Sequence, residues 1–378
     1  MRKRVAILTR RYGNNFGSAL QAYALQTIIG RINSDNVVLD YDELHHNIRW
    51  QIKPLLYDWL TRFMKIGLIA KLFPSQADFC NIRKLQIEKF ASFDQRLNKT
   101  TKKLKTKQQL SNACKDCYAC VCGSDQIWNP FLFDENYYLS FLNHTDTRKV
   151  SFAVSLGIYA PKYCTSKMID LISSFDAISI REQIGCDIIT NLTGKPTTHV
   201  IDPTLLLSQK EWEEMRSDYK IEGDYILCYF LKTEDIPNEF IRELKNKTNC
   251  RVVNIQMFYN INSVNADEHL YDVGPQDFLS LVAKARYVCT NSFHGTIFSY
   301  IFQRNFYVFN RFRKTEANNQ NSRIDDLLQL LNMRERRMSS NRSDDFPIED
   351  IDYLVSNELC KYQEISMNFL RKSLAIEA

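Results

Sequence analysis

The sequence has no long apolar run and no dominant charge, and these absences exclude several classes of protein. No window holds the roughly 20 apolar residues that a membrane span needs. The apolar run after the basic start, Val5 to Leu8, is too short for a secretory signal. A formal net charge of +5 over 378 residues falls short of the basic stripe of a nucleic-acid-binding protein. We therefore expect a cytoplasmic protein that binds no nucleic acid.

Cysteine is plentiful, with 11 residues, but no export signal accompanies it, so a disulfide framework is not expected. Four cysteines gather in CKDCYACVC, between Cys114 and Cys122. Their Cys-x-x-Cys-x-x-Cys spacing is typical of part of a zinc or iron–sulfur ligand set. No second Cys or His cluster stands nearby, and YACVC also has the pattern of a buried strand, where free Cys is common. The buried strand is the favoured interpretation, and no metal site is predicted.

Strand and helix patterns alternate along the chain, which predicts an α/β protein with parallel sheets. A chain of 378 residues exceeds what one hydrophobic core organises, so two domains are expected. We predict two Rossmann-like domains, residues 1–205 and 206–345, that face a cleft in a GT-B-like arrangement. A C-terminal helical segment, 346–378, is expected to pack back on the first domain.

A basic, helical region over about residues 50–112 is predicted to be an insertion in the first domain. Within it, WLTRFMKIGLIAKLF (59–73) is basic and amphipathic, a pattern typical of a helix that lies on a membrane surface. A helix packed against its own domain is the favoured alternative. Peripheral contact with the inner membrane surface is therefore a hypothesis for this segment.

The stretch TNSFHGTIFSYI (290–301) lies where a hydrophobic strand runs into a helix, at the carboxyl end where α/β proteins bind ligands. A helix that starts at Gly295 or Thr296 directs free N–H groups at a ligand, and such an end favours anions. Ser292 adds a hydroxyl, and His294 is able to move a proton near neutral pH. In the alternative interpretation, Ser292 only caps the helix and His294 fills a polar gap.

Two arginines stand at element boundaries. Arg181 ends the apolar strand of AISIREQIG, and its planar fork of donors suits a carboxylate or a phosphate. The alternative is an ion pair with Glu182 or with an acidic residue across the sheet. Arg323 begins the amphipathic helix of NSRIDDLL. From the sequence alone, a surface ion pair with Asp325 or Asp326 is favoured for Arg323.

Two polar loops follow strands in the first half of the chain. RYGNNFGS is similar to a Gly-rich phosphate loop but matches neither G-x-G-x-x-G nor the Walker pattern, so we expect a ligand-facing loop of unknown preference. GSDQIWNP combines a carboxylate, an amide and an indole, as in a carbohydrate subsite where a ring stacks and polar groups bind hydroxyls. In the alternative interpretation, Asp125 of this loop caps a helix.

These stretches, in this order, resemble the polysaccharide pyruvyl transferase family. The resemblance covers nearly the whole chain, from NNFGSALQAYALQ through GSDQIWNP, KVSFAVSLG, SIREQIG and VIDPTLLL to TNSFHGTIFSYIF and NSRIDDLL. It implies transfer of pyruvate from phosphoenolpyruvate onto two hydroxyls of one sugar, with formation of a cyclic ketal and release of phosphate. It also implies a GT-B-like fold whose active site lies between an N-terminal acceptor side and a C-terminal donor side.

The resemblance assigns roles to the candidate residues. Family members hold phosphoenolpyruvate, the co-substrate, with Arg and His side chains, and no cofactor or metal is expected. His294 is the expected acid–base group and Asp125 an assisting base. The expected donor-binding set is Arg181, Ser292, Gly295, Thr296 and Arg323. The expected acceptor-binding set is Asn14, Asn15, Gly17, Ser18, Gln126 and Trp128.

One position departs from the family pattern. Many relatives have an Arg two residues before the His, where this chain has Ser292; Arg323 or a basic residue of the insertion is expected to replace that charge. Two other functions stay open, a GT-B-type glycosyltransferase that uses a nucleotide sugar and a non-catalytic carbohydrate- or anion-binding relative. The acceptor, a sugar or a lipid-linked oligosaccharide, is not identified by the sequence.

Overall fold

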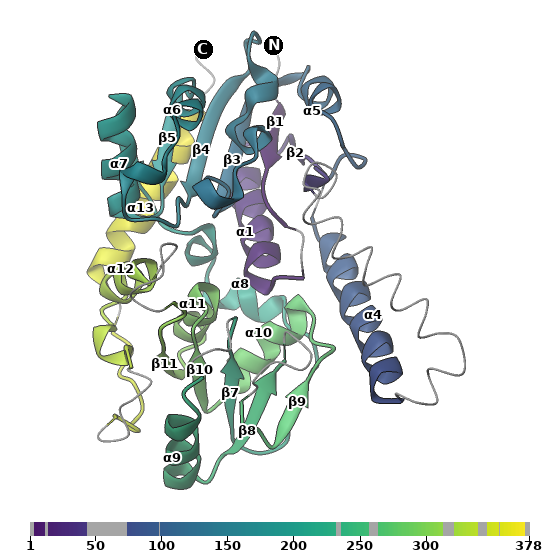
Figure 1. Cartoon of the computed structure of the whole chain (residues 1–378), viewed down its shortest axis with the longest axis vertical. Helices are drawn as coiled ribbons and strands as arrows, with labels where there is room; N and C mark the ends of the chain where they lie inside the picture. The colour runs from purple at the N-terminus through teal and green to yellow at the C-terminus, as the bar shows by residue number, and fades with distance from the viewer. Residues whose placement is uncertain are drawn as a thin grey trace.

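The computed structural model describes residues 4–11, 14–43, 74–97, 99–231, 236–256, 264–312, 321–338, 346–354 and 356–374. Two parallel sheets lie one above the other along the long axis of the molecule, each with helices around it (Figure 1). The predicted fold class, two Rossmann-like α/β domains, is confirmed.

The N-terminal sheet has six strands in the order β2-β1-β3-β4-β5-β6. Every neighbouring pair is parallel, and the strand order reverses between β1 and β3. The strands are β1 (Arg4–Leu8), β2 (Asn36–Val38), β3 (Cys117–Asp125), β4 (Arg148–Val154), β5 (Ala177–Ile180) and β6 (Thr197–His199).

The C-terminal sheet has five strands in the order β11-β10-β7-β8-β9. It is also parallel throughout, and its order reverses between β7 and β10. The strands are β7 (Tyr225–Tyr229), β8 (Arg251–Ile255), β9 (Glu268–Leu270), β10 (Tyr287–Thr290) and β11 (Asn305–Val308).

Helices connect the strands, as parallel strands require. In the first domain they are α1 (Phe16–Ile32), α4 (Pro74–Asp94), α5 (Lys107–Ala113), α6 (Ser166–Ser173) and α7 (Gln183–Thr193). After β6 the chain crosses to the second domain through α8 (Gln209–Glu214). The second domain contains α9 (Asn238–Thr248), α10 (Pro275–Lys284), α11 (Phe293–Ile301) and α12 (Ser322–Leu330), and α13 (Asn357–Ser373) follows.

Helix α1 joins the two domains. Asn15 caps it by accepting a hydrogen bond from the Ser18 backbone N–H at 3.2 Å, so the helix begins at Phe16. The ring of Phe16 stacks on Phe278 of α10 with centroids 4.8 Å apart. One hydrophobic cluster therefore runs from the N-terminal sheet through α1 into the C-terminal sheet, which fixes the start of α1 against both.

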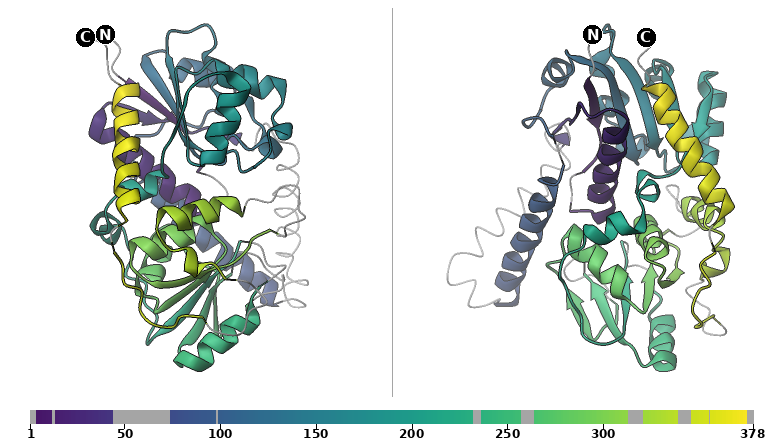
Figure 2. Two further views of the ribbon diagram at one scale, coloured as in Figure 1. Left: turned by 90° about the vertical axis from the view of Figure 1, so that its left-hand side faces the viewer. Right: turned by 180° about the vertical axis from the view of Figure 1, so that it is seen from behind.

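The last helix, α13, runs back along the N-terminal domain and is the yellow helix of Figure 2. The Ser366 hydroxyl of α13 accepts a hydrogen bond from the Ile201 backbone N–H at 3.0 Å. The Tyr118 hydroxyl of β3 donates to the Leu374 carbonyl at 2.9 Å. These contacts place α13 on the first domain. The start of the predicted C-terminal segment instead contacts the second domain, where the Tyr287 and Tyr307 hydroxyls donate to the Ile348 and Pro347 carbonyls.

The predicted basic insertion contributes α4 and α5 to the described residues. Between these helices, Thr100 and Leu104 form isolated parallel bridges with Val38 and Tyr41 at the edge of the N-terminal sheet. The amphipathic segment 59–73 lies outside the described residues. Within the described ranges, no helix is long and apolar enough to cross a membrane.

The cysteine cluster lies in the core of the first domain. Cys117, Cys120 and Cys122 belong to β3, and they and Cys114 are at most 1% exposed. Burial raises the pKa of the Cys120 and Cys122 thiols above the ordinary value. Within the part of the chain that the structure describes, no group of three or more His, Cys, Asp or Glu residues is placed to hold a metal ion. The buried-strand interpretation is confirmed.

Candidate active site

A cleft of about 610 Å³ lies between the two domains. Its walls come from the segments that follow β1 and β3 in the first sheet and β7 and β10 in the second. These are the two places where the strand order reverses, and open parallel sheets bind ligands at such switch points. The topology therefore brings both ligand-binding edges to one cavity.

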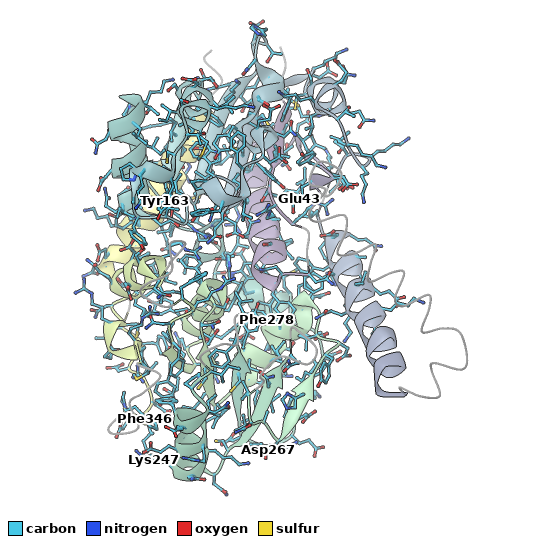
Figure 3. The ribbon with its side chains drawn as sticks, in the orientation of Figure 1. Glu43, Tyr163, Lys247, Asp267, Phe278 and Phe346 are labelled. Carbon is cyan, nitrogen blue, oxygen red and sulfur yellow. The ribbon has the colours of Figure 1, made fainter. Side chains whose placement is uncertain are left out.

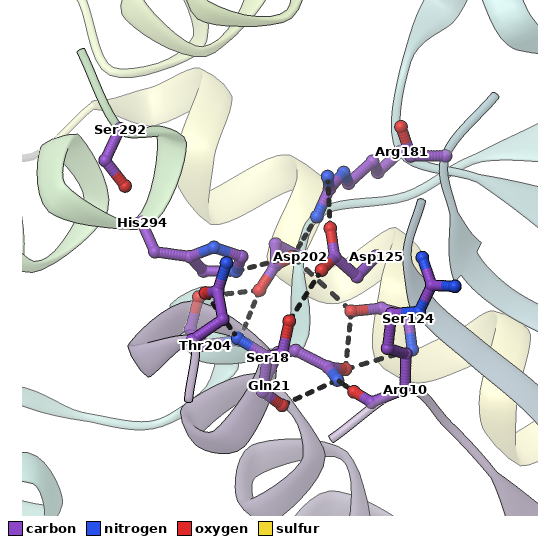
Figure 4. Close-up of polar contacts among 12 residues, drawn as sticks. Arg10, Ser18, Gln21, Ser124, Asp125, Arg181, Asp202, Thr204, Ser292 and His294 are labelled. Carbon is purple, nitrogen blue, oxygen red and sulfur yellow. Dashed lines mark hydrogen bonds and ion pairs between the residues drawn. The ribbon is translucent and has the colours of Figure 1, made fainter. Parts of the chain in front are cut away.

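Asp202, which follows β6, stands at the centre of the polar network beside this cleft (Figure 4). Its Oδ2 accepts a hydrogen bond from Arg181 Nη1 at 2.7 Å and lies 3.5 Å from Nε2 of His294. Its Oδ1 accepts from the Thr204 hydroxyl at 2.7 Å. Burial opposes ionisation, but His294 and Arg181 hold the pKa of Asp202 well below its usual range. One buried carboxylate thus links both domains.

Arg181, at the end of β5, is surrounded by acidic groups. Its guanidinium lies 2.7 Å from Asp202, 3.0 Å from Asp125 and 3.4 Å from Glu182, and its side chain is 1% exposed. Burial opposes the charged form, but these carboxylates raise the pKa of Arg181. The ion-pair interpretation is confirmed: the charge of Arg181 is balanced by protein groups, and it fixes the carboxylates beside the cleft.

Asp125 is the last residue of β3 and lines the cleft. Its Oδ1 accepts from Arg181 Nη2 at 3.0 Å and its Oδ2 from the Ser18 hydroxyl at 3.1 Å. Burial opposes ionisation, but Arg181, His294 and Arg323 together lower the pKa of Asp125. It is therefore an ionised carboxylate held between the two domains, with a role other than helix capping.

His294 reaches from α11 of the second domain to the first domain. A Cβ atom at Gly17 would come within 2.1 Å of its Nδ1, so the imidazole lies directly against the backbone at the start of α1. On its other side is Asp202. Gly17 is needed at this position because any side chain would displace the imidazole.

The start of α11 forms one wall of the cleft through Ser292, Phe293 and His294. Ser292 caps the helix, because its hydroxyl accepts from the Gly295 N–H at 3.1 Å. Thr296 is fully buried and donates its hydroxyl to the Ser292 carbonyl at 3.0 Å. Gly295 and Thr296 do not line the cleft. Their predicted contact with a ligand is corrected to a supporting role behind the helix start.

Two further arginines line the cleft, Arg323 in the first turn of α12 and Arg311 after β11. Burial, followed by repulsion from Arg181, lowers the pKa of Arg323 to about 9, and burial lowers that of Arg311. A surface ion pair for Arg323 is wrong, because the residue is 7% exposed; Asp325 lies instead 3.2 Å from Arg337. Burial thus disfavours the charged form of both arginines, although Glu182 and Asp125 counter part of this effect at Arg323 and Asp125 counters part of it at Arg311.

We call this part of the cleft the arginine end: Arg181, Ser292, Phe293, His294, Arg311 and Arg323. The opposite part, the acidic end, consists of Arg10, Glu43, Lys107, Asp134 and Glu135. There Arg10 pairs with Glu43 at 2.9 Å and Lys107 with Glu135 at 2.6 Å. The Tyr41 hydroxyl donates to Asp134 at 2.6 Å. The acidic end therefore presents many hydrogen-bonding groups with its cations already paired.

The predicted acceptor residues divide into two groups. Asn15, Ser18 and Gln126 line the cleft, whereas Asn14 and Gly17 do not. The assignment of Trp128 to a sugar-stacking role is wrong. Its indole is fully buried, stacks on Tyr138 with centroids 5.5 Å apart, and donates from Nε1 to the Tyr137 carbonyl. No face of this ring is open to a ligand.

Sequence reasoning missed Asp202, Glu182 and Arg311 as parts of this site. A usable signal existed for each, because a polar residue directly follows a buried strand in VIDPT, SIRE and VFNR. It also missed Arg10 and Glu43. Glu43 follows the short strand β2 by several residues, and nothing in the local pattern ties it to a cleft.

Several solved structures are similar to this chain at low sequence identity. A putative UDP-N-acetylglucosamine 2-epimerase from Listeria monocytogenes has a TM-score of 0.48 and 10% identity, with 96% of this chain and 94% of that chain covered. A UDP-GlcNAc 2-epimerase from Neisseria meningitidis bound to UDP-GlcNAc has a TM-score of 0.47 and 11% identity, covering 96% and 98%. S. aureus MnaA with UDP has a TM-score of 0.49 and 13% identity, covering 87% and 88%.

Among curated proteins, none matches this chain in sequence. The polysaccharide pyruvyl transferase family model matches residues 15–311. That range begins at the Asn15 cap of α1 and ends at Arg311, so it holds most of the cleft walls from both domains. The protein belongs to the polysaccharide pyruvyl transferase family.

Proposed function

We propose that this protein transfers pyruvate from phosphoenolpyruvate to two hydroxyls of one sugar, forming a cyclic ketal and releasing phosphate during surface polysaccharide synthesis. The family supports a transferase of this type. The observation that carries the donor assignment is the position of Arg311 and Arg323, two arginines that line the cleft together with the start of α11. Such a site is stabilised by an anionic ligand.

Phosphoenolpyruvate suits the arginine end because it carries a phosphate and a carboxylate. Arg311 and Arg323 supply two guanidinium forks, which bind such groups in pairs of hydrogen bonds. The first turn of α11, from Phe293, adds the positive end of a helix dipole. In this assignment Arg311 supplies charge near Ser292, and Arg181 acts indirectly, by holding Asp125 and Asp202.

The chemistry needs one group that gives and takes protons. His294, set between Gly17 and Asp202, delivers a proton to the methylene carbon of phosphoenolpyruvate. The adjacent carbon becomes oxocarbenium-like, and a sugar hydroxyl adds to it while losing its proton to the ionised Asp125. A second hydroxyl of the same sugar then displaces phosphate, loses its proton to His294 and closes the ketal. The proton on Asp125 leaves with the phosphate, so both groups return to their starting states. The arginines balance the anionic charge, so the mechanism calls for no metal or cofactor.

The acceptor is proposed to lie between Asp125 and the acidic end, where Asn15, Ser18 and Gln126 face the cavity. Paired charges there offer donors and acceptors to uncharged hydroxyls. A lipid-linked sugar is compatible with this placement, because the reacting ring alone must reach Asp125.

The test is calorimetric binding of phosphoenolpyruvate to the intact protein and to Arg323→Met and Arg311→Met. Loss of one charge-assisted contact is expected to weaken binding by about 10- to 100-fold, because such contacts contribute about 1.5–3 kcal/mol. Arg337→Met is the matched control, since Arg337 pairs with Asp325 and does not line the cleft. UDP-N-acetylglucosamine is titrated in parallel.

Retained binding in both cleft variants would reject the arginine end as the donor site. Binding of the nucleotide sugar without binding of phosphoenolpyruvate would reject pyruvyl transfer in favour of a glycosyltransferase. Release of phosphate that requires both phosphoenolpyruvate and a sugar, and that persists in a chelator, would complete the assignment.

A further inference from the structure

Aromatic side chains stand exposed beside the cleft of the first domain. Phe131 is 49% exposed and Tyr159 is 42% exposed, although large apolar side chains are usually covered in a folded protein. Phe131 lies in the turn Pro130–Leu132. The next residues along the chain, Leu132 and Phe133, line the cleft. The exposed ring is therefore continuous with the cleft wall.

A second loop, which contains Gly157 and Tyr163, packs against the turn that carries Phe131. Tyr163 places its ring 5.2 Å from that of Phe131, tilted by 53°, and the Lys162 ammonium lies 5.2 Å from the Tyr163 ring centroid. Gly157 of the same loop approaches Gln126, a cleft residue, so closely that a Cβ atom would lie 3.2 Å from the Gln126 amide nitrogen. We call Phe131, Tyr159 and Tyr163 the aromatic rim.

The rim lies on the same domain as the acidic end, next to which the acceptor is proposed to bind. Tyr163 and Glu43 both lie along the edge of the N-terminal domain that faces the second domain (Figure 3). Glu43 belongs to the acidic end, and Phe133 and Glu135 connect that end to the turn that carries Phe131. Phe131 is adjacent in the chain to the cleft residue Leu132, and the loop of Tyr159 and Tyr163 contacts the cleft residue Gln126 through Gly157, so the rim borders the cleft.

The chemistry of the rim matches a sugar ring. The C–H face of a pyranose is apolar and packs flat on an aromatic ring, which removes apolar surface of both from water. Its hydroxyls point outward, where Lys162 and Lys167 stand; the Lys167 ammonium is 2.8 Å from Glu135 and 5.5 Å from the Phe133 ring centroid. The rim carries no unpaired carboxylate that a neutral sugar would have to displace.

We propose that the aromatic rim binds a second sugar ring of the acceptor, so that the protein acts on an oligosaccharide of at least two neutral sugars. This inference rests on the proposed pyruvyl transfer, in which the first sugar ring lies at Asp125. The reacting ring occupies the cleft, and the neighbouring ring stacks on Phe131 and Tyr163. A free monosaccharide fills the cleft and leaves the rim empty.

The experiment uses the full chain saturated with phosphoenolpyruvate and measures sugar affinity by ligand-observed NMR. The probes are methyl glycosides of galactose, glucose and mannose, and the methyl glycosides of disaccharides built from them. At least one disaccharide is expected to bind about five- to tenfold more tightly than its monosaccharide, from the apolar area stacked on the rim. Phe131→Ala should erase that advantage, and Phe131→Tyr should keep it.

Leu354→Ala is the matched control, because Leu354 is an apolar side chain 70% exposed and does not line the cleft. Equal affinity for mono- and disaccharides across the panel, or an advantage that survives Phe131→Ala, would overturn the proposal. So would a Phe131→Ala variant that changes only the oligomeric state, since the rim would then bind a second copy of the chain. Phosphoenolpyruvate affinity is measured on each sample, so failure of the rim and failure of the donor site are separate results.

Discussion

The two ends of the cleft differ in how much their ion pairs are exposed to solvent. At the acidic end, Lys107 and Glu135 pair at 2.6 Å with side chains 46% and 33% exposed, so water shares in their stabilisation. At the arginine end, Arg181 and Asp202 pair at 2.7 Å with side chains 1% and 0% exposed, and Arg323 has its pKa lowered to about 9. Pairs of one basic and one acidic residue are therefore solvated at the acidic end and buried at the arginine end.

The largest expected effect is a difference in the free energy of unfolding when one carboxylate is removed at each end. Asp202→Ala leaves Arg181 and His294 without their common partner in a buried site, and we expect it to lower the free energy of unfolding by about 3–5 kcal/mol. Glu135→Ala leaves the exposed Lys107 and Lys167 without this partner and should cost about 1 kcal/mol or less. Denaturant unfolding of both variants measures the difference. Similar losses at the two positions would mean that burial does not separate the two ends.

A smaller effect, with the opposite sign, is expected at Arg323. Arg323→Met removes a buried charge that burial and repulsion from Arg181 disfavour, so the free energy of unfolding should stay unchanged or rise by about 1 kcal/mol. The same variant should lose the thermal stabilisation that phosphoenolpyruvate gives the intact protein. Melting temperatures with and without the donor report both results. A strongly destabilised variant would show that Arg323 supports the fold in the empty protein.

The last prediction concerns pH. Burial, then Glu182 and Asp325, raises the pKa of Asp326 from 3.8 to about 6. A carboxyl whose pKa is higher in the folded state binds more protons folded than unfolded, so its contribution to stability falls as pH rises from about 4 to about 6. In Asp326→Asn, the free energy of unfolding should change less between about pH 4 and about pH 6 than in the intact protein. Asp202 and Asp125 have lowered pKa values, so they affect stability below about pH 4 and with the opposite sign. A free energy of unfolding that falls more steeply between about pH 4 and about pH 6 in Asp326→Asn than in the intact protein would contradict the raised pKa of Asp326.

The fold followed from the sequence because its signals are local. Alternating strands and helices predict parallel sheets, and parallel sheets gather the residues after their strands at one edge. This was enough to place Asp125, Arg181 and His294 near one cavity. The order of strands, which aligns the two switch points on one cleft, depends on pairings between distant segments and is not written in any single stretch.

The side-chain roles were harder to predict because they depend on burial. Trp128 sits among polar residues in GSDQIWNP, yet Tyr138, ten residues later, covers its ring. Arg181 and Arg323 have the same chemistry, but only Arg181 lies within 3.0 Å of both Asp125 and Asp202. Those carboxylates come from other strands, so no local pattern distinguishes the two arginines.

Three consecutive residues at the start of α1 make three different contacts. Phe16 stacks on Phe278 of the second domain, Gly17 lies against the His294 imidazole, and the Ser18 hydroxyl donates to Asp125. Junctions between a loop and a helix usually accept insertions and deletions. This junction has no such freedom, because a shift of one residue would put the phenylalanine where only a glycine fits and the glycine where a hydroxyl is needed. Length variation in this chain must therefore occur elsewhere, and the spacing from Phe16 to Ser18 is as much a part of the site as the residues themselves.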